Sequence, residues 1–394
     1  MKKKNILVIN YYPFSASPST GGEIRLFEVY SNLARQNKDF NITFLSPMYI
    51  EPGKRKVGKV LPNLESVEYS KGYNATKNLP NIISKIEGNV DPHGINSIIS
   101  SKYDSGTVSE ILEHYENSDV IIHEHPYERY SDILLGHDDK PRIYASHNVE
   151  ANMFDTFSSN SLFSSMIREC EDSLAELSDK VFAVSEADVD YFYEINKEAF
   201  AVANGFPSAF CKKAIDRRLS QKTDKLIAMF IGSSHTPNID AANYIISEIA
   251  PRLPQVEFHI CGKVCEYVDW DNSFSGNIRM RGFITDREKH DLFSTAAVFL
   301  NPIESGGGSN IKLIEAAASG ARVVTTPFGA RGYDLTEEGI IYAAEKENFP
   351  EKIVEAIEST KYSSNFNNWF SEIYEKYSWH SVSKIYARHI RDLL

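Results

Sequence analysis

The sequence has few cysteines for its length. Its 394 residues include only four, at positions 170, 211, 261 and 265. This excludes a disulfide-stapled scaffold and fits a reducing compartment. Cys261 and Cys265 have the spacing of half a zinc site, but no second Cys/His pair with ligand spacing follows them.

Basic residues and long apolar runs are also scarce. There are 42 basic and 54 acidic residues, for a net charge of −12. This balance argues against a nucleic-acid partner, because phosphate contacts need a basic surface. No stretch approaches the ~18 apolar residues of a membrane span. Only four apolar residues follow Lys2–Lys4, fewer than the ~7–15 of a secretion signal, so we expect a buried first strand there.

We therefore expect a cytoplasmic protein. Two short basic clusters, Lys2–Lys4 and the group Lys54, Arg55, Lys56 and Lys59, are compatible with peripheral contact to the inner membrane face. Solvated loops are the alternative interpretation of such clusters, and we favour it.

Short apolar runs alternate with helical patterns in two parts of the chain. The predicted strands are 6–9, 41–45, 119–122, 142–145 and 180–184, then 226–231, 256–260, 278–281, 297–301 and 322–325. Such alternation is typical of parallel α/β sheets. Residues 50–110 are polar with scattered glycine and proline, and we expect long loops and short helices there.

The turn at Asn204–Pro207 separates the two parts. We predict an α/β fold with two Rossmann-like parallel-sheet domains, residues 1–206 and 207–379, facing a cleft. A C-terminal helix at 380–394 is expected to pack back on the first domain. In such folds ligands bind beyond the carboxyl ends of the strands.

The segment Asn301–Gly320 carries the strongest sign of a binding site. A predicted strand ends, Gly306–Gly308 turn the chain, and a helix begins at Ile311. Glycines let backbone N–H groups approach a ligand, and a helix N-terminus favours an anion, so this pattern predicts a phosphate or diphosphate site. Lys312 is placed to reach the same anion; a solvated lysine beside a flexible turn is the alternative.

Two known phosphate-binding motifs do not fit this segment. No Gly-Lys-Ser/Thr follows the glycines, which excludes a Walker loop, and G-x-G-x-x-G is absent from the first strand, which disfavours a dehydrogenase.

Glu315 follows Lys312 by three residues and shares its helix face. A carboxylate there can accept hydrogen bonds from ribose hydroxyls, whereas a surface ion pair with Lys312 is the alternative. The apolar neighbours Ala316–Ala318 indicate a packed helix and favour the ligand.

Together these segments resemble the donor-binding signature of retaining GT-B glycosyltransferases, the family 4 or group 1 glycosyltransferases. The resemblance covers most of the chain except about residues 50–115. Its matching segments are Gly21-Gly22 with Arg25, Ser146–Asn148 with Glu150, Val184–Glu186, Val202–Gly205, Phe230–Ser233, Gly282-Phe283, Pro302–Gly320, Gly329–Gly332 and Tyr377–Trp379.

The resemblance implies a metal-independent glycosyltransferase of the hexosyltransferase type, active in polysaccharide biosynthesis. The donor would be a nucleoside diphosphate sugar, UDP- or GDP-linked, bound by residues 207–379. The acceptor would be a glycan, a lipid-linked sugar or a protein. No further cofactor is implied.

The resemblance also implies roles for particular residues. The backbone of Gly307, Gly308, Ser309 and Asn310 would bind the diphosphate with Lys312, Glu315 would hold the ribose, and Gly262 and Lys263 would lie near the base. Gly21 and Gly22 would approach the donor from the first domain. His147 would lie near the transferred sugar and act in catalysis with Lys312 and Glu304.

The sequence departs from the family pattern at two places. Gly307 stands where a first glutamate is common, with Glu304 as its candidate replacement. Ser233–Thr236 stands where many members carry Arg and Lys, which leaves Arg331 and Arg25 as further candidate cations. These departures support an alternative, a non-catalytic glycosyltransferase-like subunit. A nucleotide-sugar epimerase is a second alternative, although the paired carboxylates that it would need are not evident.

The sequence His123-Glu124-His125 ends another predicted strand of the first domain. A metal site is one interpretation of these residues, but no further ligand is identifiable, so we favour a cleft wall or an acceptor contact. For Glu150 two roles are open, orienting His147 or serving as a helix N-terminal acid.

Overall fold

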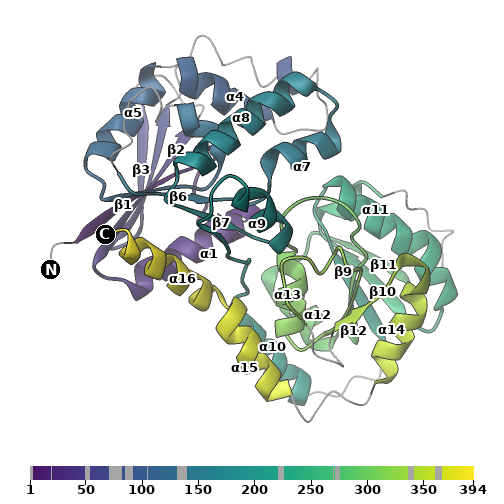
Figure 1. Ribbon diagram of the computed structural model, residues 1–394. Coiled ribbons are helices and arrows are strands. Elements are labelled where there is room, and N and C mark those ends of the chain that lie inside the picture. Colours follow the sequence, from purple (N-terminus) through teal and green to yellow (C-terminus); the bar gives the residue numbers. More distant parts are fainter. Residues whose placement is uncertain are drawn as a thin grey trace. The chain divides into compact units, whose positions relative to one another are not determined.

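A computed structural model describes residues 3–18, 20–48, 54–70, 82–84, 92–103, 105–130, 140–220, 226–268, 270, 276–335, 341–359 and 366–394. The chain forms two compact units. Unit 1 comprises residues 1–203 and 382–394, and unit 2 comprises residues 204–381. Figure 1 shows that each unit has a central sheet with helices packed on it.

Among the described residues, unit 1 has an eight-stranded sheet in the order β3-β4-β2-β1-β5-β6-β7-β8. All neighbouring pairs are parallel except β3 and β4. The strands are β1 (Lys4–Ile9), β2 (Phe40–Met48), β3 (Arg55–Leu61), β4 (Leu64–Ser70), β5 (Val120–His123), β6 (Arg142–Ala145), β7 (Lys180–Ala183) and β8 (Ala199–Ala201). The parallel central strands are buried on both faces, as their apolar sequences require.

Helices cover both faces of this sheet. On one face Leu7 and Leu45 pack with Ile111 of α5; on the other, Tyr30 of α1 contacts Phe44, which alternates with Leu45 along β2. The described helices of unit 1 include α1 (Gly21–Gln36), α4 (Pro92–Tyr103), α5 (Ser105–Glu116), α7 (Glu150–Phe157), α8 (Ser161–Leu177) and α9 (Glu186–Tyr193), and a 3-10 turn spans Pro126–Glu128. The last helix, α16 (Trp379–Asp392), contributes its residues from Val382 on to unit 1.

Unit 2 has a six-stranded parallel sheet, described in the order β11-β10-β9-β12-β13-β14. Its strands are β9 (Ile227–Ile231), β10 (Glu257–Cys261), β11 (Ile278–Gly282), β12 (Val298–Asn301), β13 (Arg322–Thr325) and β14 (Ile341–Ala343). Its helices are α10 (Ser208–Ser220), α11 (Thr236–Tyr244), α12 (Asp286–Thr295), α13 (Ile311–Ala318), α14 (Phe349–Glu358) and α15 (Phe366–Tyr377). A π-helical turn at Ile245–Ile249 and 3-10 turns at Ala250–Arg252, Lys263–Glu266 and Lys346–Asn348 complete it.

The predicted parallel α/β organisation is confirmed in both units. The expectation of loops and short helices over residues 50–110 is wrong in part, because Arg55–Leu61 and Leu64–Ser70 form an antiparallel hairpin at the sheet edge. The exposed side of β3 carries charged residues, which removes the apolar signal of a strand. The predicted loops at 71–81 and 85–91 lie outside the described residues.

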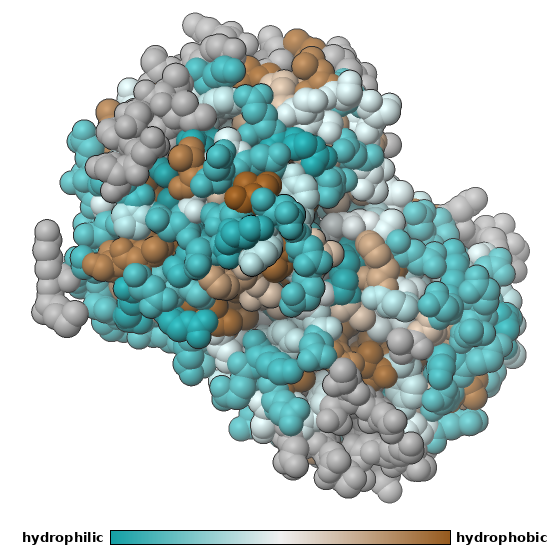
Figure 2. Space-filling view, viewed as in Figure 1, coloured by the Kyte–Doolittle hydropathy of each residue, from teal (hydrophilic) through white to brown (hydrophobic). Residues whose placement is uncertain are grey.

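Within the described residues, no helix combines the length and apolar character that crossing a membrane requires. The face seen in Figure 2 is mainly hydrophilic, and its apolar residues form small separate groups. Such scattered exposure is normal for a folded domain.

Candidate functional site

In unit 2, a glycine turn connects β12 to α13. Gly306 has φ of +107° and Gly308 has φ of +62°. Residues with side chains rarely adopt these left-handed conformations, so the glycines allow the sharp turn from strand to helix. The turn follows the carboxyl end of a central strand, where α/β folds bind ligands.

The N-terminus of α13 carries no side-chain cap. Asn310 occupies the N-cap position, but its side chain makes no capping bond and donates from Nδ2 to the Gly329 carbonyl oxygen over 2.9 Å. The first-turn N–H groups of an α-helix have no partner inside the helix and carry partial positive charge. This helix end is therefore suited to an anion.

Lys312 lies in the first turn of α13 and is half-buried. Its Nζ donates to Asn238 Oδ1 over 2.5 Å and lies 4.7 Å from the centre of the Phe230 ring. Burial lowers the pKa of Lys312 to about 7, and the Arg331 guanidinium contributes to this shift. Lys312 is thus poised to take up a proton when an anion arrives.

Arg331 also contacts the glycine turn. It donates from Nη2 to the Gly307 carbonyl oxygen over 2.6 Å, and its guanidinium stacks 4.0 Å from the centre of the Phe328 ring. A Cβ added at Gly306 would lie 3.9 Å from the same Nη2. The turn is therefore flanked by two basic side chains.

Glu315 does not form the alternative ion pair with Lys312. Both its carboxylate oxygens accept hydrogen bonds of 2.7 Å from Lys289 Nζ on α12. Glu315 is buried, and Lys289 also lies 5.6 Å from the centre of the Phe210 ring. Glu315 is therefore held in place by a partner that its sequence neighbours do not reveal.

The turns after β9 and β10 pack directly on each other. Gly262 has φ of +92°, and a Cβ there would lie 2.3 Å from the Gly232 carbonyl oxygen. A Cβ at Gly232 would in turn lie 2.9 Å from Asn238 Cβ. Because Asn238 accepts from Lys312, these contacts connect Gly262 to the cation beside the glycine turn.

Lys263 and Phe283 lie at the same edge of the sheet. Gly262 donates to the carbonyl oxygen of Gly282 over 2.7 Å, which brings the ends of β10 and β11 together. Lys263 is exposed, and Phe283 is 85% exposed. Such exposure leaves both side chains accessible to a ligand.

Ser309 and Glu304 differ in their surroundings. Ser309 Oγ accepts from Asn204 Nδ2 over 3.0 Å and lies 3.5 Å from the Tyr333 hydroxyl, so its side chain is engaged within the unit. Glu304 is exposed and pairs with Lys346 at 3.3 Å. These contacts do not support Glu304 as the replacement for the family glutamate that is absent at position 307.

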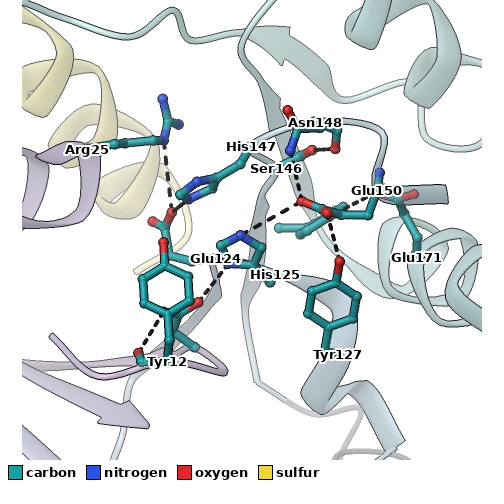
Figure 3. A network of polar contacts seen from close by, with 12 residues as sticks. Tyr12, Arg25, Glu124, His125, Tyr127, Ser146, His147, Asn148, Glu150 and Glu171 are labelled. Atoms are coloured by element: carbon teal, nitrogen blue, oxygen red, sulfur yellow. Dashed lines mark hydrogen bonds and ion pairs between the residues drawn. The ribbon is translucent and has the colours of Figure 1, made fainter. Parts of the chain in front are cut away.

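Unit 1 holds a second group of polar residues, centred on Glu124 at the end of β5 (Figure 3). Glu124 is buried, and its Oε2 lies 2.8 Å from His147 Nε2 and 4.0 Å from Arg25 Nε. The Tyr30 hydroxyl donates to Oε1. The pKa of Glu124 is raised overall, because burial raises it by more than Arg25 and Tyr30 lower it.

The two histidines of this group are neutral. Burial lowers the pKa of His147 well below its ordinary value, and Arg25 adds to the effect. His125 is shifted in the same direction by burial and by His147, whose ring centre lies 4.2 Å away. His125 Nδ1 lies 2.7 Å from Asn10 Oδ1.

Glu150 faces His125 and not His147. Its Oε1 lies 3.8 Å from His125 Nε2, and its Oε2 accepts from the Tyr127 hydroxyl over 2.7 Å. Glu171 of α8 accepts from the backbone N–H groups of Glu150 and Ala151, which begin α7. Of the two predicted roles, the helix N-terminal position of Glu150 is thus observed, and orientation of His147 falls to Glu124.

Gly21 and Gly22 begin α1, whose N-cap Thr20 forms a capping box with Glu23. A Cβ at Gly22 would lie 2.7 Å from the Tyr12 hydroxyl and 3.6 Å from His147 Nδ1. Gly22 is therefore a close neighbour of the predicted catalytic histidine.

The predicted site residues fall into two groups, one in each unit. Unit 1 brings Gly22 and His147 together, with Gly21 one residue further. Unit 2 gathers the turn residues Gly307, Gly308, Ser309 and Asn310 with Lys312. Glu315 lies further along α13. Gly262 packs on Gly232, which contacts Asn238, the partner of Lys312, and Lys263 is the next residue. Glu304 pairs with Lys346. Arg25, one of the two further candidate cations, is buried and donates to Val202 and Tyr386 within unit 1.

Lys289 was not identified from the sequence, no role was given to Asn238, which lies in a segment that matches the family, and Glu124 was not identified as the partner of His147. Lys289 lies on α12 and Asn238 lies on α11, so no spacing pattern within α13 predicts these contacts. The sequence His123-Glu124-His125 was the one available signal for Glu124. Among the described residues, no group of three or more His, Cys, Asp or Glu side chains is arranged to hold a metal ion.

A known family matches part of the chain. Residues 225–360 match the family described as glycosyl transferases group 1. The match covers most of unit 2, including the glycine turn and α13, and confirms the resemblance predicted from the motifs. No protein with a curated description matches the chain in sequence.

Solved structures extend the comparison to the whole chain. Sucrose-phosphate synthase from Thermosynechococcus elongatus has a TM-score of 0.70 at 13% identity, covering 99% of both chains. HepE from Anabaena, in complex with UDP and glucose, has a TM-score of 0.64 at 15% identity, covering 98% of this chain and 99% of the other. The catalytic domain of starch synthase IV from Arabidopsis thaliana, bound to ADP and acarbose, has a TM-score of 0.61 at 11% identity and covers 98% of both. The predicted GT-B fold is confirmed.

Proposed function

We propose that the protein is a retaining glycosyltransferase of the hexosyltransferase type that moves a sugar from a nucleoside diphosphate sugar to an acceptor hydroxyl. The observation that carries this proposal is the anion site of unit 2. There Lys312 and Arg331 flank a glycine turn at the N-terminus of α13, which has no side-chain cap. Backbone N–H groups, a helix N-terminus and two cations are a donor set for a diphosphate.

The rest of a nucleotide sugar finds matching groups along the same edge. Glu315 is a buried carboxylate held by Lys289, and a ribose hydroxyl could donate to it. Gly262, Lys263 and Phe283 offer a glycine surface and exposed side chains for a base. HepE binds UDP and glucose, and starch synthase IV binds ADP. We propose UDP or GDP as the nucleotide of this donor.

In the proposed reaction, the bond between the anomeric carbon and the diphosphate oxygen breaks and the acceptor oxygen bonds to that carbon. The acceptor proton passes to the leaving diphosphate, and the new bond retains the configuration. Negative charge grows on the diphosphate, so Lys312, Arg331 and the end of α13 stabilise the transition state most. These groups supply the positive charge without a metal ion, and we propose no further cofactor.

We propose a glycan, a lipid-linked sugar or a protein as acceptor, and His147 as the residue of unit 1 nearest the transferred sugar. We do not extend the proposal to membrane contact. In the basic cluster of residues 54–59, Arg55 pairs with Glu113 and Lys56 pairs with Glu68. These pairs reduce the positive charge that an anionic surface would attract.

Two measurements test the proposal. A screen of UDP- and GDP-sugars for hydrolysis would identify the donor without knowledge of the acceptor, and titration calorimetry with UDP, GDP and ADP would measure binding. Lys312→Met should weaken nucleoside diphosphate binding about tenfold or more, the loss of one charge-assisted hydrogen bond. Lys352→Met is the matched control, because Lys352 lies on α14 and pairs with Glu355.

The titration also separates the alternatives. A non-catalytic subunit that had lost its donor site would bind no nucleoside diphosphate, and this result would overturn the proposal. An epimerase would bind the nucleotide and convert the donor sugar without transferring it. If Lys312→Met bound as tightly as the control variant, the assigned diphosphate site would be wrong.

A further inference from the structure

We propose that Glu124 is a positioning residue that holds the imidazole of His147 with its proton on Nε2, so that Nδ1 is offered as a hydrogen-bond acceptor beside Gly22. The contacts that support this proposal lie within unit 1, and Figure 3 shows those of Glu124 with His147 and Arg25. That a sugar hydroxyl uses this acceptor rests on the proposed function; the tautomer itself does not.

The first step concerns the charge of Glu124. Arg25 is 1% exposed and always carries a positive charge, and its Nε lies 4.0 Å from Glu124 Oε2. A buried cation requires a nearby anion, because the cost of an unpaired buried charge is several kcal/mol. The Tyr30 hydroxyl donates to the other carboxylate oxygen. Both neighbours favour the ionised form of Glu124 and oppose the larger effect of burial, which raises its pKa.

The second step concerns the proton of His147. An ionised carboxylate only accepts hydrogen bonds, so the 2.8 Å contact requires that His147 Nε2 donate. His147 is neutral, because burial and Arg25 lower its pKa well below the ordinary value. A neutral imidazole has one proton, and Nδ1 therefore keeps its lone pair.

The third step concerns the surroundings of Nδ1. The position that a Cβ of Gly22 would occupy lies 3.6 Å from Nδ1 and 2.7 Å from the Tyr12 hydroxyl. A side chain at Gly22 would therefore overlap the Tyr12 hydroxyl and contact this nitrogen, so the glycine keeps that side of Nδ1 uncovered by a side chain of α1. Gly22 lies in the first turn of α1, which is anchored by its capping box at Thr20.

The fourth step connects this arrangement to the C-terminal helix. Arg25 donates from Nη2 to the Tyr386 hydroxyl of α16 over 2.9 Å and from Nη1 to the Val202 carbonyl oxygen over 3.4 Å. Tyr386 is fully buried, and its ring packs 4.9 Å from that of Phe182. The contact with α16 thus holds Arg25 near Glu124, and the positive charge of Arg25 favours the ionised carboxylate.

The decisive experiment is nitrogen NMR of the protein with labelled histidine, using long-range proton–nitrogen correlations that distinguish the two tautomers. His147→Gln assigns the signal. In the unaltered protein we expect Nε2 to carry the proton. Glu124→Gln removes the charge, and an amide can either donate or accept, so both tautomers should become populated.

Two variants serve as controls for folding and for charge. Tyr30→Phe removes one donor to Glu124 but keeps its charge, so the tautomer should persist. Glu150→Gln removes a carboxylate that faces His125, and it should also leave His147 unchanged. Circular dichroism and thermal melting would verify that each variant is folded; if Glu124→Gln is not, the tautomer in the unaltered protein and in Tyr30→Phe still decides the question.

The kinetic readout is separate. With a donor identified, Glu124→Gln should lower turnover about tenfold or more while nucleoside diphosphate affinity changes less than about threefold, because the diphosphate groups lie in unit 2. A proton on Nδ1 in the unaltered protein, or an unchanged tautomer in folded Glu124→Gln, would overturn the proposal. Failure to find any donor would overturn the proposed function and leave the tautomer result intact.

Discussion

Lys312 Nζ donates to Asn238 Oδ1 over 2.5 Å, and this contact joins the first turn of α13 to the beginning of α11. The asparagine is neutral, so it orients the lysine without balancing its charge. Arg331 also contacts the glycine turn, at the Gly307 carbonyl oxygen, and adds a second positive charge. In the ligand-free protein the Arg331 guanidinium therefore makes it harder for Lys312 to keep its proton.

The pKa of Lys312, lowered to about 7 by burial and by Arg331, predicts proton uptake on binding a diphosphate. The anion raises this pKa, so affinity should decrease as the pH rises above about 7, until the pKa of the bound state is reached. Titration calorimetry at about pH 8, in buffers with different ionisation enthalpies, measures the protons taken up. Lys312→Met should abolish the uptake, whereas Lys352→Met should retain it.

The lowered pKa of Lys312 also affects the stability of the ligand-free protein, which should rise with pH whereas diphosphate affinity falls. The unfolded chain binds the lysine proton more tightly than the folded one, because the ordinary pKa is 10.5. The contribution of Lys312 to the free energy of unfolding should therefore rise with pH between about 7 and 10.5. Equal pH profiles for the unaltered protein and Lys312→Met would contradict the assignment.

The ion pair of Lys289 and Glu315 makes a second prediction. Lys289→Met leaves Glu315 buried without a counterion and should lower the free energy of unfolding by about 3 kcal/mol. Adding Glu315→Gln removes the unpaired charge, so the double variant should recover most of that loss. Urea unfolding of the two single variants and the double variant measures the coupling.

Nucleoside diphosphate binding distinguishes this structural role from a role in the site. If Glu315 accepts from a ribose, the double variant should be stable but should bind UDP or GDP about tenfold more weakly. Full affinity in the double variant would show that Glu315 serves packing alone.

These two lysines illustrate what the sequence could and could not predict. The sequence predicts a helix that begins at Ile311, as observed, because apolar spacing and the preceding glycines are local signals. The partner of Glu315 lies 26 residues away on α12. Spacing along the helix could suggest only Lys312 as a partner, because it lies three residues from Glu315. The same limit applies in unit 1, where Arg25 meets Tyr386 across 361 residues.

The strands show a parallel contrast. Central strands such as β6 and β13 were predicted within their observed bounds, because burial on both faces produces apolar runs. The edge strand β3 has the sequence RKVGKVL, whose exposed residues are largely basic. Charge protects an edge strand from pairing with another chain and at the same time hides it from hydropathy patterns.

The third prediction concerns Glu171 and the pH dependence of the free energy of unfolding. Burial and the nearby Glu150 raise its pKa to about 8. The folded protein then holds this proton more tightly than the unfolded chain does. The contribution of Glu171 is fully present below about 4.5 and is lost as the pH rises through about 8.

Glu171→Gln cannot ionise, so the difference in unfolding free energy between the unaltered protein and this variant should change between about pH 4.5 and pH 8. Outside that window the difference should be constant. Urea unfolding at several pH values measures it, and a difference independent of pH would contradict the raised pKa.

Gly262 makes the fourth prediction. Its backbone has φ of +92° and ψ of −176°, a conformation that only glycine adopts readily, and a Cβ would lie 2.3 Å from the Gly232 carbonyl oxygen. Gly262→Ala should lower the free energy of unfolding by about 2–4 kcal/mol, from backbone strain and overpacking combined. Because Gly232 contacts Asn238, which holds Lys312, this variant should also weaken nucleoside diphosphate binding. Gly276→Ala is the matched control, since a Cβ there meets nothing within 4 Å; similar losses in both variants would refute the proposed contact chain.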